Sequence, residues 1–512
     1  MALKKHFCRW SDAVATLMIQ GCGSDVGKSL LVAGLCRLLA NRGKVVRPFK
    51  AQNMSNNAAV TAGGGEIGRS TALQALACRT PPTVDMNPVL LKPQSDMTAQ
   101  LVVRGRRIET RQAAAQGDAN AAGAGYAGAA AAFARDRSDL LQIALDSFRG
   151  LQREAEYVIV EGAGSPAETN LRAHDIANMG FAHAANVPVA LVGDIDRGHV
   201  IAALVGAHAV LDAQDRARIR GFIINKFRGD MQLFRAGIET IEARTGWKSF
   251  GIVPWLHAAG ALPAEDAMQL EHERRVRNSA RIRVAIPHLP HIANFDDFDP
   301  LRFEPDVQLE FVAPGRPLPL DADLIILPGS KATIADLEFL RAQGWHIDLQ
   351  AHVRRDGRVL GICAGYQMLG KSVQDPQRIE GPQTSSDGLD LLDVHSTMTA
   401  EKTLRPVCGI ELATGARIAG YEMHLGVTHG PGASRPMIRF DDGTCDGAVS
   451  ADGRILGCHV HGLFADPAFR AAYLATLGAR STGEDHAHRV DRALDQIAAA
   501  LESALAIDRL LT

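Results

Sequence analysis

The chain contains two short segments whose residue types could carry chemistry, and they lie far apart in the sequence. The first is a glycine-rich loop, G-C-G-S-D-V-G-K-S, from Gly21 to Ser29, between an apolar run at 15–20 and a helical pattern. A strand, a glycine loop and a helix in this order can bind phosphate, because backbone N–H groups at the start of the helix point at the anion. Lys28 would then contact the β- and γ-phosphates, and the Ser29 hydroxyl would bind Mg²⁺.

The glycine loop departs from the strict P-loop pattern by one residue. Gly21 stands six positions before Gly27, where the strict pattern has five, and position 22 is a cysteine. A glycine turn that only joins the strand to the helix is the alternative, but Gly-Lys-Ser at this junction favours a nucleotide site. We therefore expect ATP to be bound by the following residues of the loop: Gly21, Ser24, Asp25, Gly27, Lys28 and Ser29.

Carboxylates that could complete a magnesium site follow two of the predicted buried strands. Glu161 ends the run Y-V-I-V at 157–160, and Asp194 and Asp196 follow V-A-L-V-G. Because the carboxyl ends of parallel strands face the ligand crevice, these side chains are candidate metal ligands, with water completing an octahedral shell. Glu161 could instead be a turn carboxylate, and both aspartates could pair with Arg197, so the residues alone leave these alternatives open.

The second chemical segment is G-I-C-A-G around Cys363, which follows an apolar strand and precedes a helical pattern. Small residues on both sides permit the sharp turn of a nucleophile elbow, here with cysteine in the nucleophile position. The start of the following helix would stabilise a thiolate. A buried structural cysteine is the alternative, but flanking by Gly361 and Gly365 favours the elbow.

A nucleophilic cysteine needs a base, and C-H-V-H-G-L-F offers His459 and His461 at the end of an apolar strand. Alternation places both on the same face, so this pattern cannot choose between them. The segment P-G-S-K-A-T at 328–333 ends another strand, and backbone N–H groups at Gly329 and Ser330 could stabilise an oxyanion there. An ordinary helix N-terminus is the alternative for this segment.

Composition excludes several classes of protein. The 512 residues are 46% apolar, and 55 basic against 57 acidic residues leave a net charge of −2, which argues against nucleic-acid binding through bulk charge and against disorder. We expect no membrane span, because the most apolar stretch, near 200–211, is shorter than the ~20 residues required. The eight cysteines include no C-x-x-C, which fits a reducing cytoplasmic compartment.

The elements that must position these segments form two α/β regions, because short apolar strands alternate with helical patterns in each. The apolar runs of the first region lie at 15–20, 157–160, 187–192 and 221–225, and those of the second at 281–287, 323–330 and 358–365. We predict two doubly wound domains, at 15–255 and 281–475, joined by a charged linker at 256–280. The remainder, 476–512, contains an amphipathic helix at 491–505 that we expect to pack against a domain.

Eleven motifs, in order along 15–475, resemble those of the cobyric acid synthases, the glutamine-hydrolysing, ATP-dependent amidases of cobalamin biosynthesis. They are G-C-G-S-D-V-G-K-S, P-F-K-A-Q-N-M-S-N-N, E-I-G-R, M-N-P-V-L-L-K-P, V-E-G-A-G-S-P-A-E, D-I-D-R-G, I-N-K-F-R-G-D, L-P-G-S-K-A-T, G-I-C-A-G-Y-Q, G-Y-E-M-H-L-G and H-V-H-G-L-F. The resemblance implies an N-terminal P-loop NTPase-like parallel sheet, similar to that of dethiobiotin-synthetase-like ATPases. It also implies a C-terminal flavodoxin-like domain of the class I glutamine amidotransferases.

The resemblance also assigns residues. It implies that Cys363 is the nucleophile and His461 its base, and it places Glu66 of E-I-G-R with Ser29 and Glu161 at the metal. Lys50, Gln52 and Asn53 of K-A-Q-N-M would contact substrate or phosphate, although a polar turn is the alternative for this segment.

The chain departs from the family patterns at two positions. The usual amidotransferase triad has a glutamate two residues after the histidine, but Leu463 stands there, so another group must orient His461. The family's D-R-G-G is D-R-G-H here, and His199 seldom adopts the positive φ that glycine tolerates.

The implied reaction is amidation of the b, d, e and g carboxylates of adenosylcobyrinic acid a,c-diamide, with Mg²⁺, ATP and glutamine, to give adenosylcobyric acid. Three other functions are considered. These are an a,c-diamide synthase with the same two chemistries, a ParA-like nucleotide switch, and a corrinoid-binding protein with inactive sites. The K-A-Q-N-M-S-N-N block argues against the first, and the cysteine elbow against the second. Lys28, Ser29 and Cys363 argue against the third. The sequence does not indicate an oligomeric state.

Overall fold

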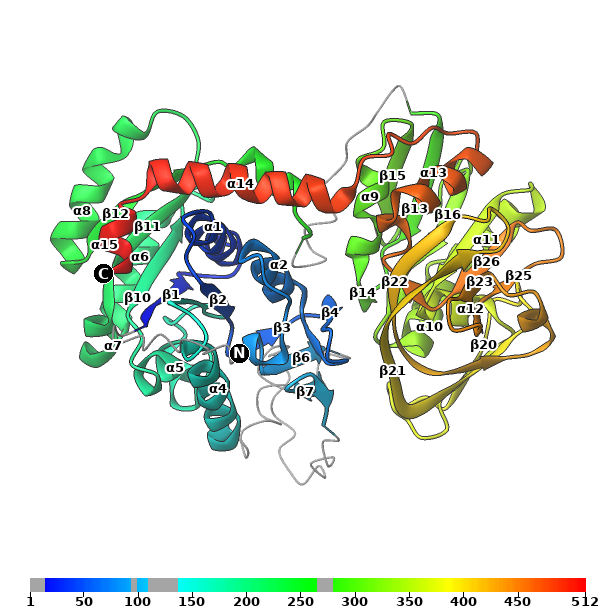
Figure 1. Cartoon of the computed structure of the whole chain (residues 1–512), viewed down its shortest axis with the longest axis horizontal. Helices are drawn as coiled ribbons and strands as arrows, with labels where there is room; N and C mark the ends of the chain where they lie inside the picture. The colour runs from blue at the N-terminus through cyan, green and yellow to red at the C-terminus, as the bar shows by residue number, and fades with distance from the viewer. Residues whose placement is uncertain (1–13, 94–98, 109–136, 265–279) are drawn as a thin grey trace, which may run out of the picture.

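The computed structural model describes residues 14–93, 99–108, 137–264 and 280–512. They form two α/β domains that lie side by side (Figure 1). We use "N-terminal domain" for the part from 14 to 264 together with the last two helices of the chain, and "C-terminal domain" for the part from 280 to 476.

The centre of the N-terminal domain is a six-stranded sheet in which every pair of neighbours is parallel. In spatial order its strands are β12 (Lys248–Pro254), β11 (Ile219–Phe227), β10 (Val189–Asp194), β1 (Ala15–Gly21), β9 (Tyr157–Glu161) and β2 (Val46–Phe49). The central strands β10, β1 and β9 are mostly apolar and buried, as expected for a parallel sheet covered on both faces. Their carboxyl ends meet at one edge, where the glycine loop begins.

Helices cover both faces of this sheet, which lies between two hydrophobic cores. They are α1 (Lys28–Asn41), α2 (Arg69–Ala77), α4 (Arg137–Gln152), α5 (Met179–Ala184), α6 (Val200–Val210), α7 (Ala213–Arg218) and α8 (Arg235–Thr245). Short 3₁₀ turns add η1 (Val84–Met86), η2 (Thr169–His174), η3 (Met231–Phe234) and η4 (His257–Ala261).

Two small sheets extend the N-terminal domain toward its neighbour (Figure 1). One contains β3 (Gln52–Met54), β6 (Val89–Pro93), β7 (Ala99–Val103) and β8 (Arg106–Arg107), and the other pairs β4 (Ala58–Val60) with β5 (Glu66–Gly68). They hold the K-A-Q-N-M, E-I-G-R and M-N-P-V-L-L-K-P motifs against the C-terminal domain.

The C-terminal domain has its own largely parallel sheet. In spatial order its strands are β15 (Val307–Val312), β13 (Ile282–Pro287), β16 (Leu324–Leu327), β18 (Arg358–Ile362), β26 (Ile455–Cys458) and the antiparallel edge strand β25 (Ala448–Val449). Its helices are α9 (Asp299–Arg302), α10 (Thr333–Ala342), α11 (Trp345–Arg354), α12 (Ala364–Leu369) and α13 (Pro467–Thr476). A two-stranded piece pairs β14 (Ile292–Ala293) with β17 (Gly329–Ser330).

A second sheet in this domain contains the long antiparallel pair β21 (His395–Glu411) and β22 (Arg417–His429). The other members are β19 (Ser372–Gln374), β20 (Ser385–Asp387), β23 (Ile438–Phe440), β24 (Cys445–Asp446) and β27 (Val460–His461). The 3₁₀ turns are η6 (Phe295–Phe298), η7 (Pro431–Ser434) and η8 (Leu463–Ala465). The sequence analysis did not predict this sheet, because the alternating pattern of its strands is interrupted by charged and polar residues.

The chain returns to the N-terminal domain at its end. Helix α14 (His486–Ala504) packs along α1, and α15 (Ile507–Leu511) reaches β1 and β12 (Figure 1). Leu494, Ile497 and Leu501 of α14 are buried in the same core as α1. The first turn of α14 instead contacts the C-terminal domain, where His486 stacks on Phe303.

Each apolar run predicted to be a strand is one in the structure, and the amphipathic helix expected at 491–505 is α14. Strands β2, β12 and β15 and the small sheets were not predicted. The strand expected at 323–330 divides into β16 and β17, because the chain turns at Pro328. The expected linker at 256–280 begins with η4, and its residues 265–279 lie outside the described part of the chain.

Candidate functional site

The glycine loop joins β1 to α1 in a conformation that requires small residues. Gly27 lies in the left-handed region with φ +92°, and a β-carbon there would stand 2.3 Å from Asn225 Nδ2. That amide donates to the Val26 carbonyl at 2.8 Å, and Lys226 Nζ donates to the Asp25 carbonyl. Asp25 itself has φ +57°. Strand β11 therefore supports the loop from outside, in a shape that only glycine permits at position 27.

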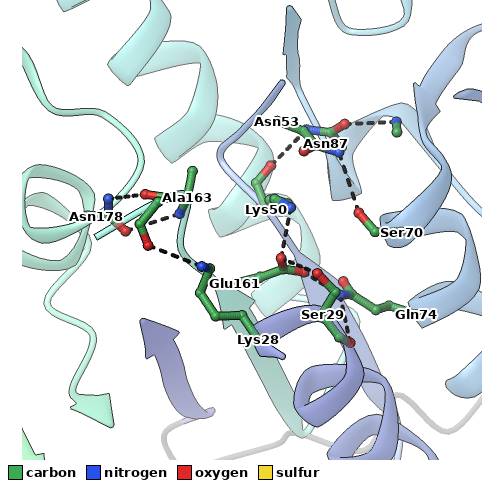
Figure 2. Close-up of polar contacts among 12 residues, drawn as sticks. Lys28, Ser29, Lys50, Asn53, Ser70, Gln74, Asn87, Glu161, Ala163 and Asn178 are labelled. Atoms are coloured by element: carbon green, nitrogen blue, oxygen red, sulfur yellow. Dashed lines mark hydrogen bonds and ion pairs between the residues drawn. The ribbon is translucent and has the colours of Figure 1, made fainter. Parts of the chain in front are cut away.

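Lys28, the first residue of α1, extends along the loop toward the carboxyl ends of the strands. Its Nζ donates to the carbonyls of Gly23 at 2.9 Å and Gly164 at 3.1 Å, and its side chain is buried. Figure 2 shows the lysine between the loop and the segment after β9. A positive charge held among carbonyls beside a helix N-terminus is suited to a phosphate.

Glu161, at the end of β9, is the centre of a polar cluster beside this lysine (Figure 2). Its Oε1 accepts hydrogen bonds from Ser29 Oγ at 2.7 Å and from Lys50 Nζ at 2.8 Å, and its Oε2 accepts one from Gln74 Nε2. The adjacent hydroxyl and carboxylate oxygens are the donor types that Mg²⁺ prefers. The predicted pairing of Ser29 with Glu161 is therefore present in the geometry.

Glu66 does not join this pair. It lies on β5 and its two oxygens are occupied by ion pairs, with Lys92 Nζ at 2.9 Å and with Lys402 Nζ of the C-terminal domain at 2.6 Å. Burial favours the neutral acid, but Lys402 and Lys92 outweigh it and lower the pKa of Glu66. Because β5 faces the domain interface, this carboxylate connects the two domains, and its contacts differ from those expected of a metal ligand.

The two aspartates after β10 also have partners of their own. Asp194 pairs with Lys226 at 2.8 Å and Asp196 with Arg228 at 2.8 Å. Arg197, the partner considered from sequence, lies 3.6 Å from Asp25 instead. His199 has φ −99°, an ordinary value, so the histidine in D-R-G-H is accommodated without a left-handed residue.

Lys50, Gln52 and Asn53 lie close together but face different surroundings. Lys50 reaches Glu161, as described above. Asn53 is buried in β3, 3.5 Å from Ser70 Oγ, and its neighbour Gln52 is partly exposed.

Cys363 lies between β18 and α12 in the geometry of a nucleophile elbow. Its φ of +54° and ψ of −112° are strained for a residue with a side chain. A β-carbon on Gly361 would stand 2.6 Å from the Tyr366 nitrogen, and one on Gly365 would stand 2.0 Å from the Leu327 carbonyl oxygen. The flanking glycines therefore allow the backbone to turn sharply and present the thiol to a cavity.

His461, at the end of β27, is oriented by a carboxylate that the sequence motifs did not identify. Its Nδ1 lies 2.7 Å from Asp297 Oδ2, and the Gly462 amide donates to Asp297 Oδ1 at 2.7 Å. Asp297 belongs to η6, 164 residues earlier in the chain. Leu463, at the position usual for the triad glutamate, is fully buried in the core. No spacing rule connects Asp297 to the H-G-L-F motif, so only the fold reveals this partner.

Cys363 and His461 influence each other's charge. Burial raises the pKa of the thiol, but the charge of His461 and its hydrogen bond outweigh burial and lower that pKa overall. Burial lowers the pKa of His461, but Asp297 and then Cys363 raise it to about 10. The directions agree on a thiolate–imidazolium pair, the reactive form of a catalytic cysteine.

His459 has a different environment. Its Nδ1 lies 2.8 Å from Asp446 Oδ1, and its ring stacks on His424 with centroids 4.0 Å apart. It affects the pKa of Cys363 less than His461 does. In the structure His461, and not His459, contacts the nucleophile. Strand alternation could not distinguish these two histidines.

Gly329 lies beside the same two residues, and Ser330 lines the same cavity as they do. A β-carbon on Gly329 would stand 3.0 Å from His461 Cε1 and 3.8 Å from Cys363 Cβ. Ser330 Oγ donates to Asp336 Oδ2 at 2.6 Å, which fixes the turn before α10.

A cavity adjoins the thiol and is lined by both domains. Cys363 and His461 lie on its C-terminal side, whereas Asn56 and Lys92 come from the N-terminal domain. The domain interface is therefore part of the wall of the thiol site.

Two features are absent from the described part of the chain. Within 14–93, 99–108, 137–264 and 280–512, no group of three or more histidine, cysteine or carboxylate side chains has the arrangement of a metal site. In the same ranges, no helix has the length and apolarity needed to cross a bilayer.

Comparison with known families matches both halves of the chain. Residues 17–269 match the CobQ/CobB/MinD/ParA nucleotide binding domain, and residues 283–469 match the CobB/CobQ-like glutamine amidotransferase domain. These boundaries enclose the glycine loop in the first case and the Cys363–His461 pair in the second.

Curated relatives match over nearly the whole length. The chain is 61% identical to the cobyric acid synthase of Caulobacter sp. (strain K31), over 97% of this chain and 98% of that protein. It is 57% identical to the cobyric acid synthase of Sphingopyxis alaskensis, over 97% of this chain and 99% of the relative.

Proposed function

The chain belongs to the cobyric acid synthase family, and from this premise we propose how its two sites divide the work of a glutamine-dependent ligase of cobalamin biosynthesis. The substrates we propose are ATP, glutamine and adenosylcobyrinic acid a,c-diamide. The product is adenosylcobyric acid, formed by amidation of the b, d, e and g side-chain carboxylates. The compartment we propose is the cytoplasm, where ATP is available and the cysteines stay reduced.

The thiol site releases ammonia from glutamine. The Cys363 thiolate attacks the side-chain carboxamide, and backbone N–H groups at Gly329 and Ser330 stabilise the oxyanion. The His461 imidazolium gives its proton to the departing nitrogen, so ammonia leaves and a thioester forms. His461 then removes a proton from water, which attacks the thioester to release glutamate and restore the thiol. Asp297 keeps the ring of His461 in place through both steps.

The cavity beside Cys363 has charges that match the backbone end of glutamine. Lys331 and Glu380 both line it, and an α-amino acid presents a carboxylate and an ammonium group. Burial lowers the pKa of Lys331 to about 8 and raises that of Glu380 to about 7. A bound carboxylate would favour the charged form of Lys331 and a bound ammonium group that of Glu380, which supports glutamine as the occupant.

The phosphate site activates the acceptor carboxylate. A carboxylate is a poor electrophile. Bound Mg·ATP would supply the phosphoryl group that converts it to an acyl phosphate. Ammonia would then attack the acyl carbon, so that inorganic phosphate leaves and an amide remains. The loop amides and Lys28 would hold the phosphates and stabilise the charge that develops during transfer. Ser29 and Glu161 would hold the magnesium ion. Lys50, which pairs with Glu161, lies beside this position and would contact phosphate or substrate.

The observation that carries the proposal is the presence, in one chain, of the Cys363–His461–Asp297 triad and of the Lys28 loop with Ser29 on Glu161. The direct test incubates the protein with the a,c-diamide, ATP and glutamine and follows the corrinoid by mass spectrometry. We expect four successive carboxylate-to-amide mass shifts, none of them without ATP. Glutamate formation without any change in the corrinoid mass would contradict the proposed substrate.

The a,c-diamide synthase reaction is tested in parallel. The same assay with cobyrinic acid as the acceptor should give no a,c-diamide. Conversion of cobyrinic acid at a comparable rate would favour that neighbouring activity instead.

A further inference from the structure

The side chain of Arg69 extends from the N-terminal domain into the C-terminal domain, where it contacts residues next to those around His461. It is the first residue of α2 and the last of the E-I-G-R motif. Its Nη2 donates to the Tyr421 hydroxyl at 2.7 Å and forms an ion pair with Asp296 Oδ2 at 2.9 Å. The Arg69 side chain is 19% exposed and that of Asp296 is 13% exposed, so the contact is largely shielded from water.

Both partners of Arg69 flank His461. Tyr421 lies opposite His461 in the pairing of β22 with β27, and the two rings stack with centroids 5.4 Å apart at 20°. Asp296 directly precedes Asp297, whose carboxylate holds His461 Nδ1. Arg69 therefore contacts the residue on one side of the imidazole and the neighbour of the residue on the other.

The chemistry of arginine suits this task. A guanidinium is planar and permanently charged, so it can hold a hydroxyl and a carboxylate in fixed directions at once. A lysine provides a single charge on a flexible stem and would fix neither direction as well. A small displacement of a catalytic group can cost about 10²-fold in rate, which makes such fixation worthwhile.

We propose that Arg69 is a positioning residue of the glutaminase site, by which the docked N-terminal domain holds Tyr421 and the Asp296–Asp297 segment around His461. Glutamine hydrolysis at full rate then depends on contact between the domains. The inference rests on the glutaminase role proposed above for Cys363 and His461.

A purely mechanical role for Arg69, as one of several contacts between the domains, is the alternative. Arg302 provides the comparison, because its Nη2 donates to the Gly260 carbonyl of η4 at 3.0 Å and so also joins the domains. Arg302 has no role in the proposed site. Removing either arginine loosens the interface, but only Arg69 touches the partners of the histidine.

The experiment measures the steady-state hydrolysis of glutamine by the full chain and four variants, Arg69→Ala, Arg69→Lys, Tyr421→Phe and Arg302→Ala. We expect Arg69→Ala to lower kcat about 10²-fold while KM for glutamine changes little, since the residue orients a catalytic group and does not bind glutamine. Arg69→Lys should fall between this variant and the unaltered chain. Tyr421→Phe should lose about tenfold, and Arg302→Ala should retain the normal kcat.

Chemical rescue separates positioning from general loosening. Guanidinium ion at millimolar concentration should raise kcat of Arg69→Ala and leave Arg302→Ala unaffected, because only the first variant has a guanidinium-shaped space beside Tyr421 and Asp296. Equal kcat losses in the two alanine variants, or no rescue of a folded Arg69→Ala, would overturn the inference. If Arg69→Ala does not fold, an unchanged kcat in Tyr421→Phe would overturn it as well. Absence of glutaminase activity in the unaltered chain would instead contradict the proposed function.

Discussion

Two histidine–aspartate pairs in the C-terminal domain differ in function because their surroundings differ. His459 and His461 are two positions apart, and each has a ring nitrogen within 2.8 Å of a carboxylate. Only the pair formed by His461 and Asp297 also contacts the thiol. The charge of Asp297 holds the imidazolium next to Cys363, and the imidazolium in turn favours the thiolate.

Replacing Asp297 by asparagine should weaken this chain of charges. Without the carboxylate the pKa of His461 falls from its raised value, and the pKa of the Cys363 thiol then rises from its lowered one. The unaltered chain keeps Cys363 as a thiolate at pH values below the pKa of a free thiol, and the variant loses this thiolate. Alkylation at neutral pH therefore slows about tenfold for each unit by which the pKa of Cys363 rises. The measurement is iodoacetamide labelling of Cys363 between pH 5 and 10, followed by peptide mass spectrometry.

Asp446→Asn is the matched control, because it changes the corresponding carboxylate on His459. We expect a much smaller shift of the labelling midpoint, since His459 affects the thiol less than His461 does. Equal shifts in the two variants would show that either histidine can serve the thiol.

Lys28→Ala tests the phosphate site at the same scale. The lysine is the one charged side chain of the loop that can neutralise a transferring phosphoryl group, and loss of such a contact costs on the order of 10²–10³ in rate. Amidation should therefore fall by this factor with glutamine or with ammonium as the nitrogen donor. Near-normal turnover with either donor would show that the loop is not the ATP site.

At the scale of elements, the last helices belong by packing to the first domain. Leu501 of α14 is fully buried against α1, and Gly34 lies so close that a β-carbon there would stand 2.4 Å from Leu501 Cδ1. Helix α14 therefore closes a core most of whose residues lie between Leu17 and Leu262.

Leu501→Ala should destabilise the N-terminal domain by about 2–5 kcal/mol, the cost of a cavity in a packed core. Ser503→Ala, at an exposed position of the same helix, should change the free energy of unfolding by less than about 0.5 kcal/mol. Urea unfolding, followed by hydrogen exchange in peptides of β1 and α1, measures both. An equal loss in the C-terminal domain would show that α14 stabilises the two domains as one unit.

In the whole molecule, each of the two sites belongs mainly to one domain, and the two domains are in contact. Glu66 of β5 bridges Lys92 and Lys402, and Arg69 contacts Tyr421, so residues of the N-terminal domain approach the thiol site. In Figure 1, α1, which follows the Lys28 loop, lies farther from the C-terminal domain than β3 and α2 do. Ammonia released at the thiol would have to pass between the domains.

Cys363→Ser should separate the two activities. The serine hydroxyl has a far higher pKa than the thiol, so almost no anion is available for attack and glutamine-dependent amidation is lost. Ammonium chloride at mildly alkaline pH provides free ammonia, which should still reach the acyl phosphate from solution. The measurement is corrinoid amide formed with each nitrogen donor.

Loss of both activities in a folded Cys363→Ser variant that still binds ATP would contradict the ammonia-donor role. Cys363 would then act on the corrinoid directly or connect the domains structurally.

The two α/β regions and both reactive segments can be predicted from the sequence. Apolar runs of strand length mark buried parallel strands, and Gly-Lys-Ser and G-I-C-A-G depend on local backbone shape, which neighbouring residues specify. Ser29 and Glu161 were predictable together because the carboxyl ends of parallel strands meet at one edge.

The side chains that these residues contact could not be predicted from the sequence, because they are brought together by the tertiary structure. Asp297 contacts His461 across 164 positions of the chain, and Arg69 contacts Tyr421 across 352. Glu66 forms ion pairs with one lysine from each domain. Such contacts depend on how η6, α2 and β5 are brought against β22 and β27, and no local spacing encodes that arrangement. Backbone conformation is set largely by near neighbours in the chain, whereas the charge state and orientation of a buried side chain are set by whatever the fold packs against it.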